Sequence, residues 1–171
     1  EIVQYATDIG LVSTITTNGT SSNRLVSDLK EAGLYVLGVS LDHWNEDICE
    51  RLRRYEGIQA KQIEIINYAK EIDLKTYALT FLNPYVVNDG IDNLIKFVNS
   101  MDIPFGFCYP TKSSYNTYRL GGVISEMNSY DELEKSVHTI LDMKKAGCEI
   151  ATLGTYMEDI LRFSRGLKPN Y

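Results

Sequence analysis

The sequence predicts an α/β fold in the form of a partial parallel (β/α) barrel with about five β/α units. Short runs rich in β-branched and aromatic residues alternate with segments whose apolar residues recur at helical spacing. Several of these runs also carry small polar side chains along one face. Alternation of strands and helices indicates a mostly parallel sheet with right-handed crossovers. The small side chains indicate how that sheet is curved.

The β-rich runs are expected to be strands, and the segments between them are expected to be helices that pack on the sheet. A helix that covers a sheet buries one apolar stripe and exposes its other side to solvent. The predicted strands span residues 11–17, 35–42, 75–83, 105–110 and 148–152. The apolar stripes fall at Leu25, Leu29 and Ala32; Ile65, Ala69 and Ile72; Ile91, Leu94, Ile95 and Val98; and Leu133, Val137, Ile140 and Leu141.

Helix ends carry their own signals. Capping boxes predict helix starts at Ser129 and Thr155, because each is followed three residues later by a glutamate. Gly33 and Gly147 stand where helices are expected to end, since glycine readily adopts the left-handed conformation that closes a helix.

Side-chain alternation favours an open barrel over a filled one. A closed eight-stranded barrel fills its lumen with bulky branched side chains, whereas small polar ones leave room for a ligand. We therefore expect a wide, incomplete barrel, with the alternative that these polar positions face solvent at a sheet edge. The small polar faces comprise Val36, Gly38, Ser40 and Asp42 in the second run, Thr14, Thr16 and Asn18 in the first, and Thr76, Ala78 and Thr80 in the third.

Composition excludes several classes of protein. The chain has 171 residues, of which 44% are hydrophobic and 23% charged, which is typical of one globular domain. The net charge is −6 and the basic residues are scattered, so no stripe exists that would bind nucleic acid. No apolar run approaches the roughly 18 residues of a membrane span, and no signal peptide is visible. We expect a cytoplasmic protein.

The cysteines and histidines do not suggest a metal site. Cys49, Cys108 and Cys148 are widely spaced and odd in number, which indicates a reducing compartment rather than a disulfide framework. His43 and His138 lie far apart without ligand-like spacing. A metal site built wholly from this chain is therefore not expected, and Cys108 is interpreted as a buried structural thiol.

Polar residues follow the predicted strands where the strands end. Thr17 and Asn18 end the first strand, and Ser40 and Asp42 end the second. Short hydroxyl and amide side chains there can hydrogen-bond a carboxylate or a ribose of a ligand, although each is also a common turn or cap residue. Their position on successive strand ends favours a ligand site at the mouth of the barrel.

Two further strand ends extend this candidate site. Asn83 ends the third predicted strand, and Tyr109 precedes Pro110 at the end of the fourth. The segment 110–128 lacks clear periodicity, and ordered loops of that length are often binding loops. We expect it to contact substrate, with a surface insertion as the equal alternative.

The order of these motifs resembles that of the radical S-adenosylmethionine (SAM) enzymes with a SPASM-like C-terminal region. Such enzymes commonly carry Thr-Asn-Gly after one strand, Ser-Leu-Asp or Ser-Ile-Asp after the next, and then an Arg-rich turn and a glycine. The chain has Thr16-Thr17-Asn18-Gly19, Ser40-Leu41-Asp42, Arg51-Leu52-Arg53 and Gly57 in that order.

The resemblance implies roles for the strand-end residues. SAM would sit at the C-terminal mouth of the barrel, where the cofactor-binding residues would be Ser40, Thr17, Asn18 and the backbone of Tyr109. Asn83 and Asp42 would contact the substrate.

The resemblance also implies cofactors and partners. A [4Fe–4S] cluster would reduce SAM and generate a 5′-deoxyadenosyl radical, which abstracts hydrogen from an unknown small-molecule or peptide substrate. A flavodoxin or ferredoxin would supply the electron. The family's three-cysteine cluster motif and its Gly-Gly-Glu-Pro stretch do not occur in the chain. We therefore expect residues 1–171 to be one partial barrel domain, truncated at the N-terminus and before a SPASM-like region, and inactive by itself.

Two other classes of function stay open. One is a non-catalytic (β/α)-barrel binding or scaffold module. The other is a SAM-independent barrel isomerase or aldolase, which would normally show a strand-end lysine or paired carboxylates with a glycine-rich phosphate loop. Truncation is also expected to leave the strand that begins at Leu11 without its neighbour, so that its unpaired edge favours aggregation or dimerisation.

Overall fold

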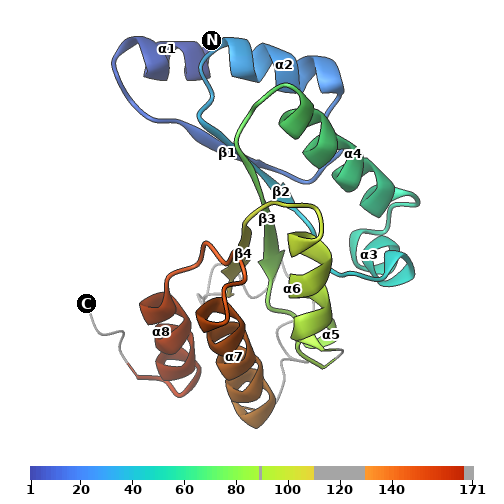
Figure 1. Cartoon of the computed structure of the whole chain (residues 1–171), viewed down its shortest axis with the longest axis vertical. Helices are drawn as coiled ribbons and strands as arrows, with labels where there is room; N and C mark the ends of the chain where they lie inside the picture. The colour runs from blue at the N-terminus through green and yellow to red at the C-terminus, as the bar shows by residue number, and fades with distance from the viewer. Residues whose placement is uncertain (89, 110–129, 168–171) are drawn as a thin grey trace. The chain divides into compact units, whose positions relative to one another are not determined.

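The computed structural model describes residues 1–88, 90–109 and 130–167. Its four strands form one sheet in the order β1-β2-β3-β4, and helices connect them (Figure 1). The pairs β1–β2 and β2–β3 are parallel. The predicted α/β fold with a parallel sheet is therefore confirmed. The chain divides into two compact units, residues 1–79 and 80–171.

The first unit contains three helix–strand repeats. Within it α4 packs on β2 and against both α2 and α3 (Figure 1). The elements are α1 (Ile2–Asp8), β1 (Thr14–Thr17), α2 (Asn23–Glu31), β2 (Val36–Ser40), α3 (Glu46–Arg53), α4 (Ile58–Glu71) and most of β3 (Thr76–Phe81).

Local side chains fix where these helices begin and end. The Ser22 hydroxyl accepts a hydrogen bond from the Leu25 N–H at the start of α2, and Asn45 does the same for Ile48 at the start of α3. Gly33 follows α2 with a φ of +88° and Gly147 follows α7 (Tyr130–Lys145) with a φ of +98°. Both predicted helix ends are therefore confirmed.

The register assigns each strand residue to one of two faces. Ile15, Leu37 and Thr76 are aligned across the three strands, and so are Thr16, Gly38 and Tyr77 one residue later. The face with Leu37 is buried, with Leu37 1% exposed. The opposite face, with Thr16, Gly38 and Tyr77, is called the inner face below.

One part of the predicted inner face is wrong. Thr76 pairs with Leu37 and Ala78 pairs with Val39, so Thr76, Ala78 and Thr80 lie on the buried face rather than beside Gly38. Thr76 is accommodated there because its hydroxyl donates to the Leu37 carbonyl at 2.8 Å. Thr14 and Thr16 do share a face with Gly38, as expected.

The second unit contains the end of β3 and the remaining helices. Within it α7 packs against α5, α6 and α8, and α6 packs on β4. Its core includes Ile95, Val98, Phe105, Val137 and Ile140, all fully buried. Its elements are α5 (Pro84–Asn88), α6 (Ile91–Asn99), β4 (Phe105–Cys108), α7 and α8 (Gly154–Ser164).

The fifth predicted strand is reduced to a single parallel bridge between Phe105 and Ile150. The ladder ends because the Phe107 N–H donates to the Thr152 hydroxyl, at 2.6 Å, rather than to a backbone carbonyl. On the other side of this segment, the Lys144 ammonium donates to the carbonyls of Ile150 and Thr152 at 2.5 and 2.7 Å. A lysine thus occupies the positions that the N–H groups of a further strand would take.

Two predicted capping boxes have different outcomes. The helix α8 begins at Gly154 with Leu153 as its N-cap and no side-chain cap, so the start predicted at Thr155 is wrong. Ser129 and the predicted loop 110–128 lie outside the described residues.

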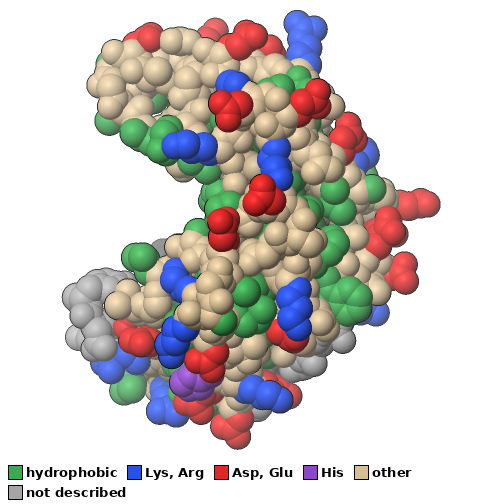
Figure 2. Space-filling model, viewed as in Figure 1, with side chains coloured by type: hydrophobic (Ala, Val, Ile, Leu, Met, Phe, Trp, Pro, Cys, Tyr) green, Lys and Arg blue, Asp and Glu red, His purple; other side chains and the backbone are tan. Residues whose placement is uncertain are grey.

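Charged side chains of both signs are mixed on one face of the molecule. On the face shown in Figure 2, Lys and Arg side chains are interspersed with Asp and Glu side chains and do not gather into a basic patch. Within the described ranges, no helix is both long enough and apolar enough to cross a membrane.

Candidate functional site on the inner face of the sheet

The hydroxyl groups of the inner face include those of Ser40, Thr16 and Tyr77, which have no hydrogen-bond partner among the described residues. Ser40 ends β2, Thr16 lies on β1 and Tyr77 lies on β3. Ser40 and Tyr77 are half-buried and Thr16 is exposed. None of the three hydroxyls makes a hydrogen bond to any described residue. They are therefore available to a ligand, as both donors and acceptors.

The turn after β1 is held by its own side chains. The Thr17 hydroxyl lies 3.0 Å from the Ser21 hydroxyl and accepts from the Gly19 N–H. The Asn18 side-chain oxygen accepts from the N–H and the hydroxyl of Thr20 at 3.0 and 2.7 Å. Thr17 pairs with Val39 and so belongs to the buried face, whereas Asn18 is exposed and keeps its amide NH₂ free of the turn.

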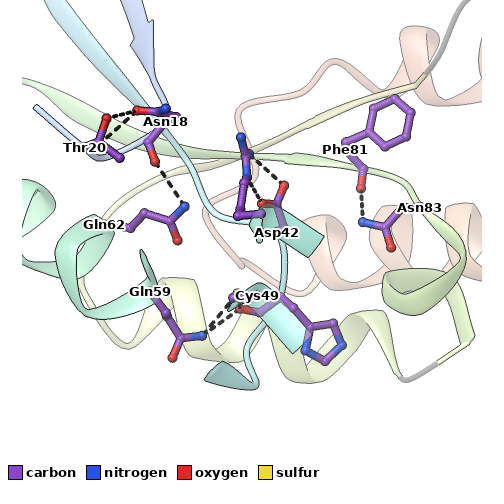
Figure 3. A network of polar contacts seen from close by, with 10 residues as sticks. Asn18, Thr20, Asp42, Cys49, Gln59, Gln62, Phe81 and Asn83 are labelled. Atoms are coloured by element: carbon purple, nitrogen blue, oxygen red, sulfur yellow. Dashed lines mark hydrogen bonds and ion pairs between the residues drawn. The ribbon is translucent and has the colours of Figure 1, made fainter. Parts of the chain in front are cut away.

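Gln62 of α4 supports this turn from below. Its side chain is fully buried, and its Nε2 donates to the Asn18 carbonyl at 3.3 Å (Figure 3). Gly19 has a φ of +87°, and a Cβ there would lie 2.5 Å from the Gln62 Cγ. Because Gly19 has no side chain, its backbone can pack closely against Gln62.

The carboxylate of Asp42 is engaged by an arginine. Both oxygens accept from Arg53 at the end of α3, Oδ2 from Nε and Oδ1 from Nη2 at 3.0 Å (Figure 3). Such bidentate geometry fixes both partners. Asp42 is 7% exposed, so this pair satisfies a buried charge beside the end of β2.

A second buried network follows Asp42. The Cys49 thiol donates to the His43 carbonyl at 3.0 Å, and the Gln59 Nε2 donates to the same carbonyl at 2.9 Å (Figure 3). The His43 Nδ1 accepts from the Asn45 N–H, so this ring nitrogen carries no proton. Burial raises the pKa of the Cys49 thiol to about 11, which keeps it protonated at neutral pH.

The two predicted site residues of the second unit have local partners. The Asn83 oxygen accepts from the N–H groups of Tyr85 and Val86, and its Nδ2 donates to the Phe81 carbonyl (Figure 3). Asn83 therefore caps α5. The Tyr109 N–H donates to the Tyr156 hydroxyl at 3.3 Å, and burial raises the pKa of the Tyr109 phenol.

Four of the six predicted site residues thus fall in the first unit, around the ends of β1 and β2. Asn83 and Tyr109 belong to the second unit, where each follows a strand, Asn83 after β3 and Tyr109 after β4. The sequence reasoning missed Tyr77, Arg53 and Gln62 as parts of the site. Gln62 did leave a signal, because it is, with Gln59, one of two polar residues inside the buried stripe of α4.

The cysteines do not converge. Cys49 is fully buried in the first unit, and Cys108 and Cys148 are half-buried in the second. In the part of the chain that the structure describes, no group of three or more His, Cys, Asp or Glu side chains could hold a metal ion.

Comparisons with known proteins give a consistent result. The family model for the radical SAM superfamily matches residues 1–98. A curated relative, the PqqA peptide cyclase of Bradyrhizobium diazoefficiens, is 29% identical over 75 residues, which cover 43% of this chain and 20% of that protein. The chain thus matches about one fifth of the length of that relative.

Solved structures share the fold. The structure of Streptococcus suis SuiB bound to S-adenosylmethionine aligns with a TM-score of 0.70 and 17% identity, over 91% of this chain and 36% of that one. The structure of anSMEcpe with bound AdoMet aligns with a TM-score of 0.61 and 13% identity, over 93% and 39% of the two chains.

Proposed function

Because this chain belongs to the radical SAM superfamily, we propose that it forms the SAM-orienting part of a radical SAM enzyme of the SPASM-like group. The observation that carries the proposal is the Ser40 hydroxyl, which lies half-buried at the end of β2 and has no partner among the described residues. The carboxyl ends of parallel strands are where (β/α) barrels bind their ligands.

The groups on the inner face suit SAM chemically. SAM carries ribose hydroxyls and a carboxylate, and neutral hydroxyl and amide groups pair with both. Ser40 would hold the ribose or the methionine portion, and the Asn18 amide would donate to an oxygen of SAM or substrate. Since the Tyr109 N–H is already donated to Tyr156, its carbonyl would approach the adenine. SAM, when bound and reduced, supplies a 5′-deoxyadenosyl radical.

The remaining predicted residues would support the site. Asp42, fixed by Arg53, sets the direction of the chain after Ser40, and Asn83 does the same after β3 by capping α5. Thr17 closes the turn that presents Asn18. Any substrate contact by Asp42 or Asn83 would use the lone pairs that these bonds leave free.

An iron–sulfur cluster does not fit the cysteines of this chain, because Cys49 is fully buried and bonded to the His43 carbonyl. We therefore assign no cluster ligand here, and a [4Fe–4S] cluster would have other ligands. The name of the Bradyrhizobium relative includes a peptide, so we propose a peptide as the substrate class, with a flavodoxin or ferredoxin as electron donor.

SAM binding by the 171-residue chain tests the proposal. Equilibrium dialysis with radiolabelled SAM should show saturable binding, and Ser40→Ala should weaken it about 3- to 10-fold, the effect of one neutral hydrogen bond. Ser100→Ala is the matched control, because Ser100 bonds only the Phe97 carbonyl at the end of α6. Absence of saturable binding by the wild-type chain would contradict the proposal.

A further inference from the structure

Tyr77 lies on the inner face of the sheet, beside a glycine that leaves room for its ring. It is aligned with Gly38 and Thr16, while Ser40 is aligned with Leu79. Tyr77 therefore lies two residues below Ser40 along the sheet, which is about 6.5 Å. A ligand that rests on Ser40 and extends into the barrel would meet Tyr77 next.

Gly38 makes room for the phenol. A Cβ on Gly38 would lie 2.8 Å from both the Cζ and the hydroxyl oxygen of Tyr77, and 3.0 Å from the Thr16 hydroxyl. The end of the Tyr77 ring thus lies directly over the Gly38 backbone, next to Thr16. Any larger residue at position 38 would displace it.

The Tyr77 hydroxyl differs from most tyrosine hydroxyls of the described chain in having no hydrogen-bond partner there. Half-buried tyrosines usually satisfy their hydroxyl, and the exposed Tyr35 and Tyr55 also do so in this protein. Partnered hydroxyls are those of Tyr35, Tyr55, Tyr68, Tyr130 and Tyr156.

We propose that Tyr77 is a ligand-contacting residue, which donates a hydrogen bond from its hydroxyl to an oxygen of SAM and forms, with Thr16, the polar floor of the SAM site. Gly38 is the residue that permits this contact. The inference rests on the proposed function and adds to it a residue from the strand next to that of Ser40.

The binding test compares matched tyrosine variants of the 171-residue chain in the same dialysis experiment. Tyr77→Phe keeps the ring and removes the hydroxyl, so SAM binding should weaken about 3- to 10-fold. Tyr35→Phe is the control, because that half-exposed hydroxyl already pairs with Lys75, and its affinity should match the wild type. Gly38→Ala should weaken SAM binding at least as much as Tyr77→Phe does, since the added Cβ displaces the Tyr77 ring.

Nuclear magnetic resonance detects the contact between Tyr77 and SAM directly, so this test does not depend on a difference in affinity between variants. With tyrosine labelled by ¹³C at Cζ, the Tyr77 signal is the one that Tyr77→Phe removes, and SAM should shift it while leaving the Tyr35 signal unchanged. Saturable SAM binding with an unmoved Tyr77 signal and an unaltered Tyr77→Phe affinity would overturn this inference and leave the proposed function intact. Failure of the wild-type chain to bind SAM would overturn both.

Discussion

Cys49 shows how a single buried side chain stabilises the connection after β2. Its thiol and the Gln59 amide both donate to the His43 carbonyl, so three segments of the first unit meet at one oxygen atom. The network lies just beyond Ser40 and Asp42. Its integrity therefore determines where the candidate ligand residues of β2 are held.

The raised pKa of Cys49 predicts a specific dependence of stability on pH. The pKa is about 11 in the folded chain against an ordinary 9.0, so the folded state holds this proton more tightly than the unfolded state does. The contribution of the protonated thiol to the free energy of unfolding is complete below about pH 9 and is lost as the pH rises towards 11. It amounts to at most roughly 2 to 3 kcal/mol.

Urea unfolding of the wild-type chain and of Cys49→Ala from pH 8 to 11 measures this contribution. The wild type should lose more of its free energy of unfolding over that range than Cys49→Ala does. Cys148→Ala, which changes a thiol outside the network, should follow the wild type. Parallel pH profiles for the wild type and Cys49→Ala would show that the thiol ionises as freely in the folded state as in the unfolded state.

At the residue scale, the sequence identified positions better than partners. Ser40 and Asn18 could be placed at strand ends because the alternation of β2 and the Asn-Gly turn are local signals. The pairing of Asp42 with Arg53 could not, because it depends on how α3 turns back towards the strand it follows. Tyr77 was missed because the register of β3 against β2 decides which face it occupies.

Among the elements, the turn between β1 and α2 has the most demanding geometry. Gly19 combines a positive φ with a close approach to Gln62 of α4. A substitution there meets two separate penalties, backbone strain and a steric clash. Gly10 has a φ of +77° but nothing within 4 Å of its missing Cβ, so it experiences only the first.

We predict that Gly19→Ala destabilises the chain by about 2 to 4 kcal/mol, and Gly10→Ala by about 1 kcal/mol. The difference measures the contact with Gln62. Chemical denaturation followed by circular dichroism gives both values. Gly19→Ala should cost less free energy of unfolding in the Gln62→Ala background than in the wild type, because the Gln62 Cγ is absent there. Equal costs for Gly19→Ala and Gly10→Ala would exclude the clash.

The elements also show where a sequence pattern is insufficient. The helix ends at Gly33 and Gly147 were predictable because glycine acts locally. The side of β3 that faces inward was not, because a buried threonine can satisfy its hydroxyl on a backbone carbonyl, as Thr76 does on Leu37. The fifth strand reduces to a bridge because Thr152 and Lys144 satisfy backbone groups that a strand would pair, which β-propensity does not reveal.

For the whole molecule, the composition of the chain limits its chemistry. Its three cysteines are spread over both units, and Cys49 is buried. We predict that reconstitution of the 171-residue chain with iron and sulfide yields no stoichiometric [4Fe–4S] absorption and no cleavage of SAM. Iron and sulfide analysis with chromatography of 5′-deoxyadenosine checks this, and a full cluster with turnover would contradict it.

The position of β1 predicts self-association. It is the first strand in the sheet order, so one of its sides has no strand partner in the described sheet, and exposed apolar residues such as Leu11 and Val12 precede it. Light scattering of the 171-residue chain should show a concentration-dependent dimer. Thr14→Lys should reduce it by placing like charges at the paired edges, whereas Thr155→Lys on α8 should not. A monomer at all concentrations would contradict the prediction.

The ammonium of Lys144 limits what such association can produce. Because it already satisfies the outward carbonyls of Ile150 and Thr152, strands can be added to this sheet through β1 but not beyond the opposite segment. When two copies pair through their β1 strands, the free edge of each β1 is occupied by the other copy. No β1 edge then remains for a third copy. The assembly should therefore stop at a closed pair.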